Sequence, residues 1–112
     1  YIIYFLSPKN IYISNAYIFM AVEIRWEGLL LKIKVPFHRR FPDKLRGKTS
    51  KCYWDRDNKQ WVVELRDESD IRGALWALQF CGFITEEEKV EKYRKIVDLV
   101  NQTYGFNWPK VW

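Results

Sequence analysis

The chain has 112 residues, of which 48% are hydrophobic and 18% aromatic, and its formal net charge at pH 7 is +5. This size allows one domain with a single core, and the apolar content excludes an intrinsically disordered protein. The two cysteines, Cys52 and Cys81, are too few for a disulfide framework, and the lone His38 completes neither a zinc site nor a catalytic triad. We therefore expect a cytoplasmic protein with reduced thiols, without a metal or other cofactor.

The first nineteen residues differ from the rest of the chain. Their apolar runs are interrupted by a Ser-Pro-Lys-Asn segment, so none reaches the ~20 residues that a bilayer span needs. The segment also lacks the basic start and the cleavage site of a secretory signal. Because the only methionine is Met20, two interpretations stay open. Residues 1–19 are an extension that precedes a domain of residues 20–112, or they supply an extra edge strand over Ile11–Phe19.

Two strands are predicted next. Apolar and charged residues alternate from Val22 to Glu27, which is the period of a half-buried strand. A tight turn follows, and apolar residues then alternate from Leu29 to Val35, where a proline ends the strand. The two strands should form an antiparallel hairpin whose outer face carries Lys32 and Lys34.

A basic segment follows the hairpin. From Arg39 to Lys51 there are six Lys or Arg residues and one acid. Pro42 suits the first turn of a helix and Gly47 can terminate one, so a short helix is expected over about residues 42–46.

The stretch Ser50–Leu65 has the pattern of a second β-hairpin. Two aromatic and β-branched runs flank a polar turn, residues 55–59. Trp54 and Trp61 should pair across this hairpin or lie diagonally. We expect core positions for four tryptophans, namely Trp26, Trp54, Trp61 and Trp76.

Two helices and an aromatic tail complete the chain. Capping residues at 67–70 predict a helix that ends at Gly82, and the Thr85-to-Glu88 capping box predicts a second one that runs to about Tyr104. The tail, residues 106–112, should dock on the body or on a partner. The fold class is therefore α+β: a twisted antiparallel sheet of about four strands, in the order ββαββαα, with the two C-terminal helices covering one face.

Positive charge is concentrated in one part of the chain. Residues 20–66 carry twelve Lys or Arg against six Asp or Glu, which favours a polyanionic partner. The basic side chains should converge on the sheet face or edge opposite the helices and contact phosphate, while two aromatic residues stack on unpaired bases. The predicted nucleic-acid-binding residues are Lys32, Lys34, Phe37, Arg39, Arg40, Lys44, Arg46, Lys48, Lys51, Tyr53 and Arg56. The alternative is a solvated basic surface that keeps an aromatic-rich protein soluble.

The sequence gives little support to catalysis. Asp55, Asp57 and Glu64 could bind a divalent ion, but aspartates in a predicted turn more often cap backbone amides. No phosphate-binding glycine loop, dinucleotide fingerprint or nucleophile elbow is present. We therefore expect a protein that is not an enzyme.

The segment around the second hairpin resembles the HARP domain of annealing helicases, and small modules of some other helicases and integrases. In the shared pattern, a strand ends in Pro-aromatic and a short helix follows. A basic residue then precedes aromatic-Asp, three residues, Lys, any residue and Trp. Here Pro36-Phe37, Lys51, Trp54-Asp55, Lys59 and Trp61 supply these positions, within a match of roughly residues 30–80.

This resemblance implies a DNA-binding module that recognises single strands or junctions, works beside a larger partner and has no catalysis of its own. Lys51 corresponds to a basic residue of the pattern. Cys52 and Tyr53 stand where arginines are common, which puts contact there in doubt. DNA is thus favoured over RNA.

Two alternatives stay open. One is a structural RNA-binding protein of a ribonucleoprotein particle such as the ribosome. The other is a protein-interaction adaptor that uses the 85–105 helix and the aromatic tail as a docking surface. No membrane partner is expected.

Overall fold

The computed structural model describes residues 2–6 and 22–112. The α+β class and the order ββαββαα are confirmed, and an additional strand precedes them. The edge strand predicted at Ile11–Phe19 lies outside the described residues. In chain order the elements are β1 (Ile2–Leu6), β2 (Glu23–Glu27), β3 (Leu30–Lys34), α1 (Phe41–Lys48), β4 (Cys52–Asp55), β5 (Gln60–Glu64), α2 (Glu68–Phe80) and α3 (Glu86–Tyr104).

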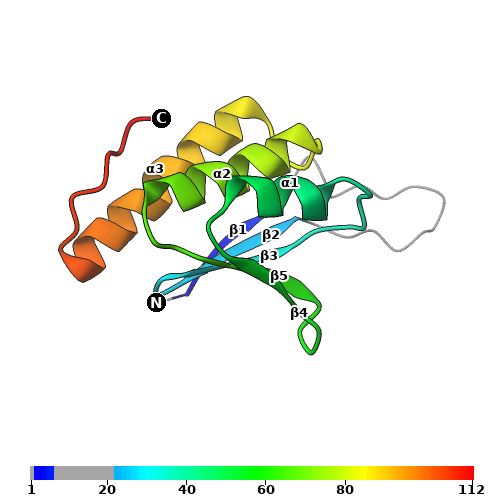
Figure 1. Ribbon diagram of the computed structural model, residues 1–112. Helices are drawn as coiled ribbons and strands as arrows, with labels where there is room; N and C mark the ends of the chain where they lie inside the picture. Colours follow the sequence, from blue (N-terminus) through cyan, green and yellow to red (C-terminus); the bar gives the residue numbers. More distant parts are fainter. Residues whose placement is uncertain (1, 7–21) are drawn as a thin grey trace.

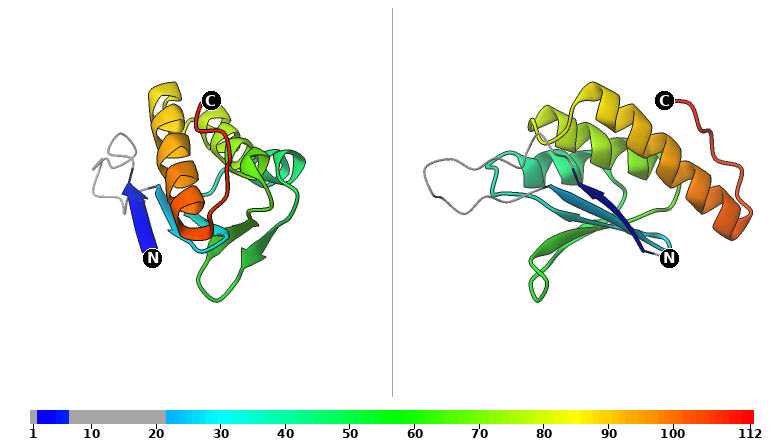
Figure 2. Two further views of the ribbon diagram at one scale, coloured as in Figure 1. Left: turned by 90° about the vertical axis from the view of Figure 1, so that its left-hand side faces the viewer. Right: turned by 180° about the vertical axis from the view of Figure 1, so that it is seen from behind.

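The strands form one antiparallel sheet in the order β1-β2-β3-β5-β4. All three helices lie on one face of this sheet, and the β4–β5 hairpin curls away from them (Figure 1). In the views from the side and from behind, the opposite face carries no helix (Figure 2). Within the described ranges, no helix is long and apolar enough to cross a membrane.

The core lies between the sheet and the helices. In β2 and β3 the buried residues alternate as predicted, with Ile24, Trp26, Leu31 and Ile33 fully buried. The helices contribute the apolar faces that their spacing predicts, and the two predicted capping boxes are formed at Asp67 and Thr85. The N-terminal end of each of these two helices is therefore fixed by its own sequence.

Asp70 fastens three segments together beneath α2. Its buried carboxylate accepts hydrogen bonds from the backbone N–H groups of Ser50 (2.8 Å), Arg66 (2.7 Å) and Asp67 (3.2 Å). Burial alone would raise the pKa of Asp70, but these bonds to the ionised form outweigh it, so the pKa lies below its ordinary value. The linker that follows α1 is thereby held against the start of α2.

A glycine allows α1 and α2 to pack closely. A Cβ atom at Gly73 of α2 would lie 1.8 Å from the carbonyl oxygen of Lys48, at the C-terminal end of α1. No other residue type fits this contact without moving a backbone. Gly73 therefore sets the distance between the two helices.

The aromatic tail docks on the body. Asn101 of α3 bonds the backbone of Trp108 through both its amide oxygen and its amide nitrogen, and the Tyr93 hydroxyl donates to the carbonyl oxygen of Pro109 at 2.6 Å. The Trp112 ring lies edge-on to Tyr93, with the guanidinium of Arg72 over both rings. The expectation that the tail docks is met by the chain itself.

Candidate nucleic-acid interface

The structure divides the eleven predicted contact residues among three places. Six lie on α1 or on the loop that leads into it: Phe37, Arg39, Arg40, Lys44, Arg46 and Lys48. Lys32, Lys34 and Tyr53 lie on the open face of the sheet, and Lys51 and Arg56 lie at the two ends of β4. The expected convergence opposite the helices is wrong, because α1 belongs to the helical layer and packs against α2.

Acidic neighbours pair with most of the cations on the open sheet face. Lys32 lies 3.3 Å from a carboxylate oxygen of Glu27, and Arg25 lies within 4 Å of Glu23 and Glu27. Arg25 also donates to Gln60 at 2.6 Å. These contacts join β2, β3 and β5 into one polar network, so this face presents little net positive charge.

Lys51 and the β4–β5 turn show the same balance. The Lys51 ammonium lies 3.4 Å from a carboxylate oxygen of Glu64. Asp55 accepts hydrogen bonds from the backbone and side chain of Asn58 and from Gln60, as the turn pattern predicts. In the part of the chain that the structure describes, no three His, Cys, Asp or Glu residues are grouped to hold a metal ion.

The cations on one flank of α1 lie over aromatic rings of α2. Arg40, Lys44 and Lys48 are four residues apart, so they share the helix face toward α2. The Lys44 ammonium lies 4.6 Å from the centre of the Phe80 ring, with Arg40 at 6.0 Å, and the Lys48 ammonium lies 4.7 Å from the centre of the Trp76 ring. These are cation–π distances. No carboxylate of residues 2–6 or 22–112 forms an ion pair with any of these three cations.

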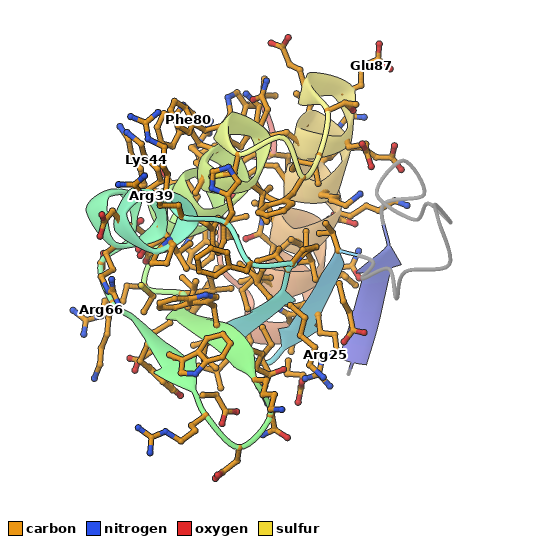
Figure 3. All side chains as sticks on the ribbon, turned by 90° about the vertical axis from the view of Figure 1, so that its right-hand side faces the viewer. Arg25, Arg39, Lys44, Arg66, Phe80 and Glu87 are labelled. Carbon is orange, nitrogen blue, oxygen red and sulfur yellow. The ribbon has the colours of Figure 1, made fainter. Side chains whose placement is uncertain are left out.

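A basic hollow of about 600 Å³ opens beside this flank. Arg39, Arg40, Asp43 and Lys44 line it. Arg39 and Lys44 extend side by side next to Phe80, while Arg25 lies on the far side of the sheet (Figure 3). Asp43 is the one acid of the group, and it lies 3.8 Å from Arg46. The hollow therefore keeps an excess of positive charge.

The field of this cluster reaches the neighbouring thiol. Burial raises the pKa of Cys81, and the positive charges of Lys44 and Arg40 partly oppose that rise. Cys81 and Cys52 are both free, as the sequence predicts.

The other flank of α1 borders an aromatic hollow of about 280 Å³. Trp54 and Trp61 are directly paired across the hairpin, with their ring centres 5.4 Å apart. Trp61 is buried, but 48% of Trp54 is exposed, so the predicted core position of Trp54 is wrong. Trp54 faces the helical side, yet β4 is the edge strand and α1 covers it incompletely. The hollow is lined by Val35, Pro36, Phe37, His38, Phe41, Pro42, Trp54 and Trp61.

Arg46 connects the aromatic hollow to the charged helix. Its guanidinium lies 5.1 Å from the centre of the Trp61 ring. Phe37 stands at the rim of the hollow, and 92% of its surface is exposed. Of the two predicted stacking residues, Phe37 thus belongs to this site, while Tyr53 lies on the opposite sheet face.

Sequence reasoning missed the aromatic half of the interface. Trp76 was assigned to the core and Phe80 received no role, yet both lie under the cations of α1. The spacing of Trp76 and Phe80, four residues apart on a predicted helix, was a usable signal for a shared face. Comparison with protein-family models, curated proteins and solved structures finds no match for this chain.

Proposed function

We propose that this protein is a non-enzymatic nucleic-acid-binding module whose interface is α1 with its two flanks. Arg39, Arg40, Lys44 and Lys48 contact phosphates, with Arg46 on the other flank. Lys32, Lys34 and Lys51 contribute less, because carboxylates lie next to them in the sheet. The observation that carries the proposal is the row of cations on α1 without carboxylate partners, held over aromatic rings beside the basic hollow.

The cation–π contacts support binding in a specific way. Lysine and arginine normally lose side-chain entropy when they are fixed against a ligand. Rings of Phe80 and Trp76 already position three of these side chains, so less freedom remains to be lost. Because neutralising phosphates releases counterions, affinity should fall steeply between about 50 and 200 mM salt.

A charge-reversal pair tests the proposal. The double variant Arg40→Glu, Lys44→Glu should weaken binding to a labelled 20-nucleotide strand about 10- to 100-fold at 50 mM NaCl, measured by fluorescence anisotropy. The control is Arg94→Glu, Lys95→Glu on α3, which makes the same change in net charge away from α1. An equal loss in both variants would show that only net charge matters and would contradict the assignment to α1.

The choice between DNA and RNA is a second experiment. We propose DNA, single-stranded or at junctions, because the sequence pattern resembles that of a DNA-binding module. Competition among single-stranded DNA, duplex DNA, a forked DNA and RNA strands of the same sequence ranks them directly. Preference for folded RNA would move the protein to the ribonucleoprotein class. The reduced cysteines fit action in the cytoplasm.

A further inference from the structure

The aromatic hollow has the size and lining of a site for one flat ring. At about 280 Å³ it lies just below the usual range for small-molecule sites, so it suits a single ring system. The lining is mainly aromatic and proline side chains. Trp54 and Trp61 meet edge to face at 62°, which leaves a half-exposed indole as one wall.

The charge around the hollow identifies what kind of ring fits. Arg46 lies against the Trp61 ring, and Arg39 and Arg40 follow the loop that lines the hollow. A ring attached to a polyanionic chain satisfies both features, since the ring enters the apolar site while the phosphates meet the cations. An uncharged apolar peptide would satisfy only the first.

We propose that the aromatic hollow captures one unpaired nucleobase, a role that rests on the proposed nucleic-acid function. The base stacks on the exposed indole of Trp54, Phe37 closes over it from the rim, and the adjoining phosphate contacts Arg46. A duplex cannot supply this base without unpairing it, so the hollow selects single-stranded segments over duplex. Capture does not depend on which base is offered, because every base has a ring face.

The test compares oligonucleotides with and without bases. A deoxythymidine 12-mer should bind the wild-type chain about 5- to 100-fold more tightly than a 12-mer of abasic tetrahydrofuran sites with the same backbone. Trp54→Ala and Phe37→Ala should each reduce this ratio toward one while leaving the salt dependence of binding unchanged. Phe37 is so exposed that its substitution does not threaten the fold. Trp54→Phe should retain much of the ratio.

The matched control is Phe106→Ala. Phe106 is similarly exposed and stacks on Tyr104 and Trp108, but it belongs to the tail. This variant should keep the wild-type ratio.

The outcomes separate the two proposals. Equal, salt-dependent binding of both 12-mers overturns the base site and leaves the nucleic-acid function standing. Failure to bind either 12-mer, with no salt dependence, overturns the function and the base site together. Binding of a proline-rich peptide that depends on Trp54, with no response to oligonucleotides, overturns both in favour of peptide docking.

Discussion

The open face of the sheet and the exposed flank of α1 both carry several cations, but their surroundings differ. On the sheet, antiparallel pairing places Glu23 and Glu27 of β2 opposite the lysines of β3. On α1, the neighbouring element is α2, whose facing residues are Trp76 and Phe80. The same residue types are therefore neutralised in one region and held ready for an anion in the other.

This difference shows that a count of basic residues along the chain does not locate a binding surface. Partners across strands or helices decide whether a cation is already paired. In this protein, the registers of the sheet and the approach of α1 to α2 decide it. The predictions below alter that approach or the anchoring of α1, in order of decreasing effect.

Gly73→Ala should have the largest effect on stability. The new methyl group would meet the Lys48 carbonyl oxygen, so α1 must move away from α2. We expect the free energy of unfolding to fall by roughly 3 kcal/mol or more, because overpacking against a backbone cannot relax easily. Affinity for single-stranded DNA should fall as well, since α1 would lose its position over Trp76 and Phe80.

Gly47→Ala is the matched control for Gly73→Ala. Gly47 lies on α1 itself, and a Cβ there meets no atom within 4 Å. Denaturant unfolding should show this variant to be as stable as the wild type or more so, because alanine favours a helix. Similar destabilisation by both substitutions would contradict the close-contact explanation.

Asp70→Asn should have the next largest effect. Asparagine turns one carboxylate oxygen into an amide donor, which would face the N–H groups of Arg66 and Asp67 or of Ser50. We expect a loss of roughly 2–3 kcal/mol in the free energy of unfolding at pH 7. Asp43→Asn, at an exposed position of α1, should cost far less.

The same pair has opposite responses to acid. Because the folded-state pKa of Asp70 is lowered, its stabilisation is fully present above the unfolded value of about 4 and is lost as the pH falls further. The wild type should lose this increment in unfolding titrations below about pH 4, whereas Asp70→Asn should lack it. Parallel curves for the two proteins would contradict the role of the carboxylate.

Trp112→Ala should have the smallest effect of these three. Arg72 and Lys89 lie over the Trp112 ring, so the tail holds cations on an aromatic ring just as α2 does. We expect a loss of about 1 kcal/mol in thermal or denaturant unfolding and no change in nucleic-acid affinity. Val111→Ala, next to it and 80% exposed, is the control. Loss of a protein partner together with unchanged DNA binding would instead favour the adaptor alternative.

Much of the fold followed from local patterns. Alternation in residues 22–35, the Trp54–Trp61 hairpin and the capping boxes at Asp67 and Thr85 are all encoded within short stretches, and the structure agrees with them. The predicted helix over residues 42–46 is one turn longer, from Phe41 to Lys48, because Arg40 and Phe41 already belong to its start.

The position of the candidate site depended on contacts that no short stretch encodes. Trp54 alternates inward as predicted, but only the sheet order reveals that β4 is an edge that α1 leaves partly uncovered. Likewise, the approach of α1 to α2 depends on Gly73, thirty residues from the cations it positions, and a glycine within a helix gives no such signal. The residues of the interface were therefore predictable, but their grouping was not.

The most direct test of the central claim compares two pairs of neutralised cations. Arg40→Gln, Lys44→Gln and Lys32→Gln, Lys34→Gln remove the same charge from α1 and from the sheet. For each, the logarithm of affinity for a single-stranded DNA is plotted against the logarithm of salt concentration. The α1 pair should lower the slope by about two, since each lost phosphate contact removes about 0.9. The sheet pair should leave the slope nearly unchanged. Equal slopes for the two pairs, or a larger drop for the sheet pair, would contradict the account.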